Sequence, residues 1–464
     1  MAIRIPHRFH TWRSLPHWRS RIVFWSGGTL VGLIAALFAI LADEAQSGFR
    51  QVVTASPYWP LLLTPAAFAL SVTLARRFFP GSQGSGIPQT IAARQLTDDT
   101  ARQRVVSVRI AVGKVVLTLL GLACGASVGR EGPTVQVGAS ILHAAGQASG
   151  RHYQGVILAG SAAGVAAAFN TPLAGIVFAI EEMSRSFEQK TSGLVLTTVI
   201  IAGMASLALL GNYTYFGHSS ATITSLKDWL AVPLCGLGGG LMGGVFSRIV
   251  VAVARGSGRL QAVAKRYPVL FAACCGLLIA LLGLASANTI YGTGYREARQ
   301  LLEGASDVPA SFGLFKMAAT ILSSISGIPG GIFAPSLAIG AGIGANLSAL
   351  LPGVPVSTLV LLGMVGYFAG VVQAPITSFV IVMEMTDNHA MAIPLMATAL
   401  LGYGASRFIG TEAIYHALSQ GFLSNHTEAA APAGHRCINL GRIARSGSSR
   451  IRSRVSVQAP SLSC

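Results

Sequence analysis

The chain contains many apolar segments that are long enough to cross a lipid bilayer. The first extends from Ile22 to Leu41, a run of 20 residues without a charged side chain. A helix of that length spans the roughly 30 Å of hydrocarbon in a bilayer. This run is too long for the apolar core of a signal peptide, and comparable segments follow it. With 52% hydrophobic and 11% charged residues, the sequence predicts an all-α, polytopic membrane protein.

The net charge of +17 lies around the apolar segments rather than over a soluble surface. Because basic residues accumulate on the cytoplasmic side of membrane proteins, we expect a multi-pass protein of the inner membrane with both termini cytoplasmic. A nucleic-acid-binding tail is the alternative interpretation. The distribution of the basic residues favours a role in setting the membrane topology, with no nucleic-acid partner. The basic residues are Arg4, Arg8, Arg13, Arg19 and Arg21 before the first segment, Arg436, Arg442, Arg445, Arg450, Arg452 and Arg454 after the last, and Arg94, Arg102, Arg104, Arg109, Arg255, Arg259, Lys265 and Arg266 in candidate cytoplasmic loops.

The six cysteines have no spacing typical of metal or disulfide sites. No CxxC motif occurs, and Cys124, Cys235, Cys274 and Cys275 lie in apolar runs, where cysteine packs as a small hydrophobic residue. We therefore expect no disulfide framework, no metal site and no cofactor.

Four landmarks recur in the same order in the two halves of the chain. The pairs are Lys114 and Lys316, Gly129 and Gly331, Pro172 and Pro375, and Glu181 and Glu384, with offsets of 202 (316 − 114 and 331 − 129) and 203 (375 − 172 and 384 − 181). Gly84-Ser85-Gly86 is echoed by Gly292-Thr293-Gly294 at an offset of 208 (292 − 84). Duplicated halves with interrupted helices are typical of transporters whose substrate site lies between the repeats, near mid-membrane. An odd number of crossings per half would make the repeats inverted.

These patterns predict five regions along the chain. Residues 1–21 form a basic cytoplasmic N-terminus, 22–210 the first membrane repeat, and 211–225 the connection between the repeats. Residues 226–422 hold the second membrane repeat and a C-terminal helix. The tail, 423–464, lacks apolar periodicity and is expected to be basic, cytoplasmic and disordered.

Three glycine- and proline-containing strings lie within apolar sequence and predict helix starts. They are GSGIP at 84–88, GREGP at 129–133 and GIFAP at 331–335, with Gly84, Gly86, Pro88, Gly129, Pro133, Gly331 and Pro335 as the structural residues. Proline suits a first helical turn, and glycine permits a sharp turn before it. A helix N-terminus presents unpaired N–H groups and about half a positive charge. Several such ends could replace the water shell of a chloride ion and still release it.

Glu131 lies inside the second string. A carboxylate at bilayer depth costs about 2.5 to 3.5 kcal/mol on insertion scales, so its presence indicates a function. Desolvation penalises the charged form, whereas the helix N-terminus and Arg130 favour it. If desolvation outweighs these two effects, Glu131 can alternate between occupying the anion site and carrying a proton. The structural alternative is a static ion pair with Arg130.

Other polar residues are weaker candidates. Glu181 has a partner in the second repeat, which suggests capping or pairing, whereas Glu182 has none and is the better candidate for proton entry. Ser85 could bind an anion or cap a helix, and Tyr415 could bind an anion or anchor at the membrane interface. Lys114 and Lys316 either add buried positive potential or extend to the surface.

The three strings, with NTPLAGIVFAIEEM and APITSFVIVMEMTDN, resemble the CLC family of chloride channels and chloride/proton antiporters over residues 20–422. The resemblance implies a CLC-type fold of two inverted repeats with many tilted and broken helices. It further implies a homodimer, embedded in membrane lipid, with a separate pore in each subunit. A transporter of chloride and protons, rather than an enzyme, is expected, without the cytosolic regulatory domains of eukaryotic relatives.

The resemblance also implies residue roles. Ser85, Tyr415 and the backbone N–H groups of Ile332 and Phe333 would bind the central chloride. Arg130 and Gly132 would surround an outer site, with Glu131 as its gate. Glu182 matches the inner proton-transfer position of the exchangers, which passive channels lack. The serine in GSGIP is similar to the chloride-preferring members.

Two other functions are compatible with parts of the sequence. A passive chloride channel of the same family, in which protonation of Glu131 opens the pore, differs from an exchanger in proton coupling. An intramembrane serine hydrolase would use the GxSxG string around Ser127 with His143 or His152, although the strand-to-helix context of that motif is missing.

Overall fold

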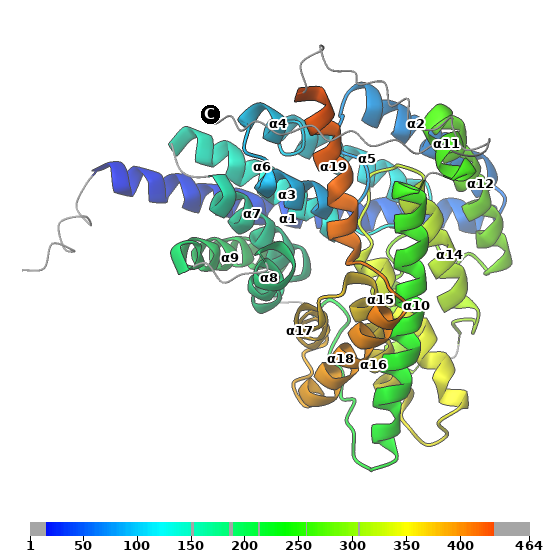
Figure 1. Cartoon of the computed structure of the whole chain (residues 1–464). Helices are drawn as coiled ribbons and strands as arrows, with labels where there is room; N and C mark the ends of the chain where they lie inside the picture. Colours follow the sequence, from blue (N-terminus) through cyan, green and yellow to red (C-terminus); the bar gives the residue numbers. More distant parts are fainter. Residues whose placement is uncertain are drawn as a thin grey trace, which may run out of the picture.

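Helices of very different lengths make up the protein, because glycine and proline interrupt the apolar segments (Figure 1). The computed structural model describes residues 15–149, 153–184, 189–211, 214–256, 258–304 and 307–430. The elements of the first half are α1 (Leu15–Ala55), α2 (Pro60–Arg77), α3 (Ile87–Gln95), α4 (Asp99–Gln103), α5 (Val108–Ala123), α6 (Glu131–Ser149), α7 (Tyr153–Phe169), α8 (Pro172–Phe178), the π-helical turn η2 (Ala179–Ser184) and α9 (Gln189–Leu210).

The second half repeats this alternation of long and short helices. It contains η3 (Asp228–Leu230), α10 (Ala231–Arg255), α11 (Arg259–Arg266), α12 (Pro268–Ala285), α13 (Tyr295–Leu302), α14 (Phe312–Ile325), α15 (Phe333–Asn346), η4 (Leu347–Ala349), α16 (Val356–Val372), α17 (Pro375–Thr386), α18 (Ala392–Phe408) and α19 (Ile414–Ala430).

Long apolar helices surround shorter buried ones. The segments long and apolar enough to span a bilayer, within the described residues, are Arg21–Ala55, Asp99–Ala123, Gly193–Leu210, Asp228–Arg255 and Pro268–Ala285. By contrast, α15 and α16 are buried along almost their whole length. Non-helical backbone at membrane depth is tolerated only where protein surrounds it. The interrupted helices of the centre satisfy that condition.

Glycines let equivalent helix pairs approach closely in the two halves. A Cβ on Gly138 in α6 would overlap the carbonyl oxygen of Gly160 in α7. In the second half, a Cβ on Gly340 in α15 would lie 2.5 Å from the carbonyl oxygen of Gly363 in α16. Small residues at such crossings allow backbone-to-backbone packing inside a membrane. The offsets, 202 (340 − 138) and 203 (363 − 160), are those of the predicted repeats.

The paired glutamates cap one another's helices. Glu181, in η2 after α8, accepts hydrogen bonds from the N–H groups of Ile376 (3.0 Å) and Thr377 (2.6 Å) at the start of α17. Glu384, near the end of α17, accepts from the N–H groups of Leu173 (3.2 Å) and Ala174 (2.7 Å) at the start of α8. Each carboxylate therefore satisfies orphan donors of the other helix. The predicted capping role of Glu181 is confirmed.

The paired lysines are fully buried and bind main-chain carbonyls. The ammonium of Lys114 donates to the carbonyl of Gly84 at 2.8 Å, immediately before α3. That of Lys316 donates to the carbonyls of Ile290 and Gly292 at 2.8 and 2.7 Å, before α13. The alternative that these side chains extend to the surface is therefore wrong. They hold the turns that lead into two short helices.

The C-terminal helix is longer than the sequence predicts. We expected order to end at Phe422, but α19 continues to Ala430. The reason is local, because residues 423–430 contain neither glycine nor proline and include the good helix formers Ala and Glu. The rest of the predicted disordered tail, 431–464, and residues 1–14 of the predicted basic N-terminus lie outside the described residues.

Candidate anion site

The starts of α3, α6 and α15 meet at one point because their preceding loops hydrogen-bond to one another. Gly84 donates its N–H to the carbonyl of Ile328 at 3.1 Å and accepts from the N–H of Gly330 at 3.0 Å. Gly129 and Gly331 exchange two hydrogen bonds, of 2.8 and 2.7 Å. These contacts form two isolated β-bridges between otherwise helical segments. All three predicted helix starts are confirmed, and their positive ends converge.

Glycines permit this close approach. Gly86, the N-cap of α3, has φ of 102°, and a Cβ there would lie 2.8 Å from the carbonyl oxygen of Gly132. A Cβ on Gly132 would overlap the hydroxyl of Ser85. Pro88, Pro133 and Pro335 each lie in the first turn of their helix, where the missing N–H costs nothing. Any larger residue at Gly86 or Gly132 would separate α3 from α6.

Two buried hydroxyl groups lie beside the start of α15. The hydroxyls of Ser85 and Tyr415 have no hydrogen bond of ordinary geometry to another described residue, although the two side chains interact. Ile332 is the N-cap of α15 and Phe333 its first residue. A buried hydroxyl without a partner costs about 1 to 3 kcal/mol. Two such groups next to helix N–H donors indicate a position suited to an anion.

Glu131, the first residue of α6, is completely buried next to this position. One carboxylate oxygen accepts a hydrogen bond from the hydroxyl of Tyr215 at 3.2 Å, and the other has no hydrogen-bond partner of ordinary geometry. That second oxygen turns back against Gly129, and the N–H of Ala334 in the first turn of α15 interacts with the carboxylate. The carboxylate thus lies where a small anion would meet the helix starts.

The side chain of Arg130 is directed elsewhere. Its guanidinium donates to the carbonyl of Ala39 at 2.7 Å and forms an ion pair with Asp43 at 3.1 Å, both on α1. It also lies over the ring of Tyr215, 5.7 Å from the centroid. The static Glu131–Arg130 ion pair is therefore wrong, because α1 offers Arg130 other acceptors. The charge of Arg130 still acts on Glu131, but from a greater distance than in a direct ion pair.

Glu182 is a second buried carboxylate near Tyr415. It lies in the π-helical turn η2 and is 2% exposed. His416 lies beside it, with Nε2 3.8 Å from the carboxylate and 3.0 Å from the main-chain oxygen of Glu182. The hydroxyl of Tyr415 interacts electrostatically with both Glu182 and Glu131. Both predicted proton-transfer residues are therefore within electrostatic reach of the same tyrosine.

An open cavity of about 380 Å³ leads to the two hydroxyl groups. Ser85, Tyr415 and Ile332 lie among its lining residues, together with Arg76 and Lys265. Glu131 does not line it. Anions can therefore approach Ser85 and Tyr415 through this cavity, whereas Glu131 is buried away from it.

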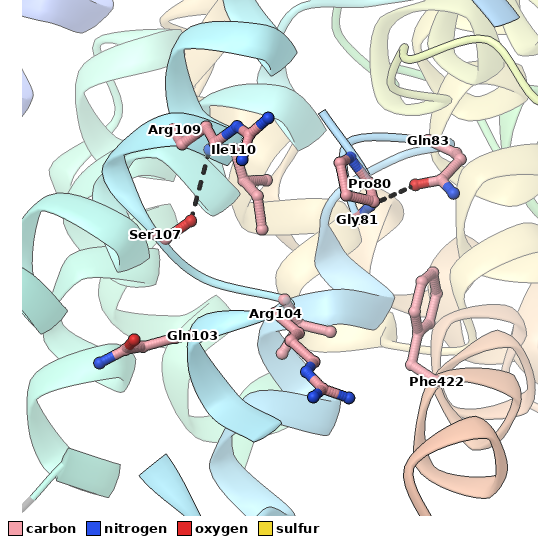
Figure 2. A pocket seen from close by; sticks show the side chains of 10 residues that line it. Pro80, Gly81, Gln83, Gln103, Arg104, Ser107, Arg109, Ile110 and Phe422 are labelled. Carbon is pink, nitrogen blue, oxygen red and sulfur yellow. Dashed lines mark hydrogen bonds between the residues drawn. The ribbon is translucent and has the colours of Figure 1, made fainter. Parts of the chain in front are cut away.

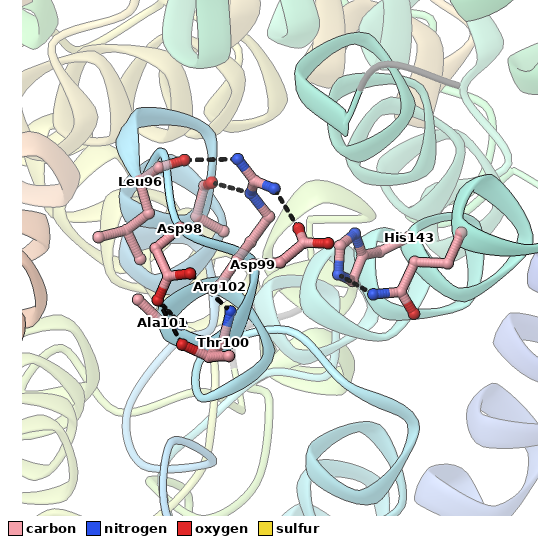
Figure 3. Close-up of polar contacts among 9 residues, drawn as sticks. Leu96, Asp98, Asp99, Thr100, Ala101, Arg102 and His143 are labelled. Atoms are coloured by element: carbon pink, nitrogen blue, oxygen red, sulfur yellow. Dashed lines mark hydrogen bonds and ion pairs between the residues drawn. The ribbon is translucent and has the colours of Figure 1, made fainter. Parts of the chain in front are cut away.

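A polar cluster at the other end of α3 fixes that short helix. Arg102 donates to the carbonyls of Ala93 (3.2 Å) and Leu96 (2.6 Å), at the C-terminus of α3, and forms an ion pair with Asp99 at 2.5 Å (Figure 3). His143 of α6 lies next to this cluster. Cations at a helix C-terminus are stabilising. Arg102 therefore helps to set the position of Ser85.

Ser127 has no hydrolase-like surroundings. It is completely buried, and its hydroxyl lies 2.9 Å from the hydroxyl of Thr320. Its N–H donates to the hydroxyl of Ser323 at 3.1 Å. The serine joins α14 to the loop before α6, and His152 lies outside the described residues. The GxSxG string is accounted for by packing.

Comparison with known proteins identifies relatives of this chain by sequence. A sequence profile described as voltage gated chloride channel matches residues 66–407. The chain is 31% identical over 433 residues to the H(+)/Cl(-) exchange transporter ClcA of Yersinia pestis bv. Antiqua (strain Angola), covering 87% of this chain and 88% of that protein. It is 30% identical over 422 residues to the protein of the same name from Vibrio vulnificus (strain YJ016), covering 86% and 88%.

Solved structures of antiporters also match the fold of this chain. The structure of a slow cyanobacterial Cl−/H+ antiporter superposes with a TM-score of 0.76 at 26% identity, covering 88% of this chain and 99% of that one. A CLC-type fluoride/proton antiporter gives a TM-score of 0.73 at 22% identity, covering 86% and 96%. At 22% identity, the second match is evidence for the fold alone.

Proposed function

The chain belongs to the voltage-gated chloride channel family, and from this membership we propose that it exchanges chloride for protons across its membrane, with Glu131 as the gate. Relatives named H(+)/Cl(-) exchange transporter match along most of both chains. The observation that carries the gate is the fully buried carboxylate of Glu131 at the point where the three helix starts meet.

Glu131 competes with chloride because both are anions that the same helix ends attract. The ionised carboxylate takes the outer position, supported by the hydroxyl of Tyr215 and the N–H of Ala334. Protonation removes the charge that holds it there, so the side chain leaves and chloride enters. Transport should therefore rise as the pH falls. Because the same carboxylate either occupies the anion position or carries a proton while chloride takes its place, the movements of the two ions are coupled.

Glu182 supplies the inner end of the proton route. Its burial and its position beside His416 and Tyr415 support this role. An ionisable group within a membrane protein carries a desolvation cost that a function must offset. Glu181, one residue earlier, is occupied with the N-terminus of α17 and is not part of the route.

Chloride reaches its central position through the cavity lined by Arg76 and Lys265. Ser85 and Tyr415 donate their hydroxyls to it, with the N–H groups of Ile332 and Phe333. These donors carry partial charges, which bind a halide without retaining it. The exchanger needs no cofactor and no chemistry on its substrate.

Charge and exposed apolar side chains support a proposal for orientation and assembly. We propose that the cavity side, with Arg76 and Lys265, faces the cytoplasm, the side on which the sequence predicts both termini. We further propose a homodimer through α8, α9, α17 and α18, which lie together at one edge (Figure 1). Large apolar side chains are exposed on this surface, namely Leu173, Leu196, Ile200, Met204, Ile376, Ile393, Met396 and Leu400.

A coupled-flux measurement in sealed proteoliposomes tests the proposal. An imposed chloride gradient should drive protons against their own gradient. Chloride flux without proton movement in the unmodified protein would contradict exchange and indicate the passive channel instead. Unchanged chloride and proton flux in a Glu131→Gln variant would contradict the role of the gate.

A further inference from the structure

A basic and apolar corner forms where α2 ends and α12 begins, with α11 between them (Figure 1). We call it the α11 corner, and define it by Arg76, Arg77, Arg259, Lys265 and Arg266. Helices α2 and α12 pack tightly, since a Cβ on Gly276 of α12 would lie 2.9 Å from the carbonyl oxygen of Thr64. Arg76 and Lys265 line the same cavity. Arg76 and Lys265 therefore lie on the cavity side of this corner, and Arg259 and Arg266 lie on the other face of α11.

This corner contains unbalanced positive charge. Residues 45–97 and 229–296, which supply its helices, contain no aspartate or glutamate. Among the ion pairs of the described residues, none involves the five cations, whereas nearby Arg255 is paired with Glu412 at 2.6 Å. All five side chains belong to exposed residues. Within the described residues these five cations have no carboxylate partner, so an anion from outside the protein can act as their counterion.

The two faces of α11 carry different residues. Arg259, Val263 and Arg266 follow the i, i+4, i+7 spacing of one helix face, and Leu260 lies beside them. Leu260 and Val263 are 50% and 48% exposed. Gln261, Ala264 and Lys265 line the cavity that leads to Ser85. The helix has no buried residue, so the protein alone does not cover its apolar face.

Aromatic side chains flank the cations on the same surface. Arg266 lies over the ring of Tyr267 at 5.3 Å, and Arg77 over the ring of Phe78 at 5.8 Å. Both rings are exposed, and Leu270 in the first turn of α12 is 62% exposed. Aromatic and basic side chains next to a lipid-facing apolar surface are typical of the headgroup level of a bilayer.

We propose that the α11 corner binds the headgroup of an anionic phospholipid from the cytoplasmic leaflet, with α11 lying in the interface. The phosphate lies between Arg259 and Arg266, and the acyl chains lie along Leu260, Val263 and the outer face of α12. The proposal uses the orientation given above but does not depend on ion exchange. Only α11 separates the bound headgroup from the cavity, because Gln261 and Lys265 on the opposite face of α11 line that cavity.

The test measures lipid selectivity of the full-length protein reconstituted in nanodiscs. The probe is a spin-labelled phosphatidylglycerol, compared with spin-labelled phosphatidylcholine. Each basic residue near an anionic surface contributes about 1 kcal/mol, a factor of about five in binding. Arg259→Gln/Arg266→Gln should therefore reduce the selectivity for phosphatidylglycerol by about an order of magnitude.

The matched control is Arg104→Gln/Arg109→Gln, which removes two exposed arginines from a second cavity of about 500 Å³ on the proposed cytoplasmic side (Figure 2). Figure 2 shows both arginines among the lining residues of this cavity, which include none from α11. The control should keep the full lipid selectivity. An equal loss of selectivity in both variants would mean that diffuse surface charge, and not a site at the α11 corner, attracts the lipid, and would contradict the proposal.

Two further arms separate a lipid from free phosphate. Leu260→Gln/Val263→Gln keeps every cation and should still weaken phosphatidylglycerol binding, because the acyl contact is lost. Inorganic phosphate at millimolar concentration should not displace the labelled lipid, and displacement would overturn the lipid assignment. Coupled flux measured in neutral-lipid vesicles should persist in all variants, so a failed lipid site would leave the exchange proposal separately testable.

Discussion

The starts of α6 and α15 face each other across the anion site and are built alike, but they carry different chemistry. Gly129 and Gly331 are joined by reciprocal hydrogen bonds, and each string has proline four residues later. With the repeat offset of 202, Glu131 corresponds to Phe333 (131 + 202). The first helix therefore offers a titratable group where the second offers an aromatic ring. The repeated residues stabilise the fold, and we propose that coupling comes from residues that differ between the halves.

Glu131→Gln should have the largest effect, because it makes the two helix starts equally uncharged. Proton flux should fall by about two orders of magnitude or more, the usual size of a lost proton-transfer group. Chloride flux should persist and lose its pH dependence. Paired chloride and proton electrodes on the same vesicles measure both.

The control is Phe333→Leu at the corresponding position of α15. It should change the chloride rate while leaving the ratio of chloride to protons unaltered. If Phe333→Leu also lost coupling, the proposal that only the first half provides the coupling residue at this position would be wrong.

Glu182→Gln tests the second residue that lacks a counterpart. Proton flux should again fall by about two orders of magnitude, with chloride flux retained, because no anion ligand is removed. The neighbouring Glu181→Gln is the matched control and should keep the coupling ratio of the folded protein. Uncoupling by Glu181→Gln with normal coupling in Glu182→Gln would reverse the assignment.

The paired lysines should affect stability rather than coupling. Lys316→Met removes the donor to several buried carbonyls and should lower the free energy of unfolding by about 3 kcal/mol, since each orphaned group costs about 1 to 3 kcal/mol. Lys114→Met should cost about 2 kcal/mol. Unfolding in mild detergent measures both. Normal stability in either variant would show that the buried contacts are not needed.

Glu181→Gln and Glu384→Gln should give smaller and nearly equal losses. Each carboxylate satisfies two N–H groups at the start of the opposite short helix, a capping contribution of about 1 to 2 kcal/mol. The comparison of the two melting temperatures is the measurement. A large difference between them would mean that the caps are not equivalent, and the symmetry would be only approximate at α8 and α17.

Asp43→Asn should have the smallest effect. Its carboxylate is 69% exposed, and an exposed ion pair is worth about 1 kcal/mol or less. Arg130 would still donate to the carbonyl of Ala39. Thermal unfolding should therefore change by little. A severe loss of thermal stability would show that the Arg130–Asp43 ion pair contributes more to the packing of α6 against α1 than the geometry implies.

Residue type and spacing predicted the helix starts, because glycine and proline act locally. The repeat offset likewise identified Glu181 and Glu384 as structural. The partner of Glu131 was not predictable, since Tyr215 lies in the connection between the repeats and no spacing links it to the gate. Nor could the pairing of Arg130 with Asp43 be found, because such contacts depend on how distant helices pack.

Spacing also left the lysines and the C-terminal boundary undecided. Burial of Lys114 and Lys316 depends on carbonyls that only the folded turns present. The end of α19 depends on helix propensity rather than on apolar periodicity, which is the signal we used for Phe422.

The two β-bridges have a consequence for how the transporter moves. Because they tie the turns before α3, α6 and α15 into one block, these helices cannot separate one at a time to let an ion pass. A turnover cycle that swung whole helices apart would have to break several backbone hydrogen bonds in a dry interior. Rotation of one carboxylate about its own bonds requires none of this, so the moving part can be as small as a single side chain within a stationary frame.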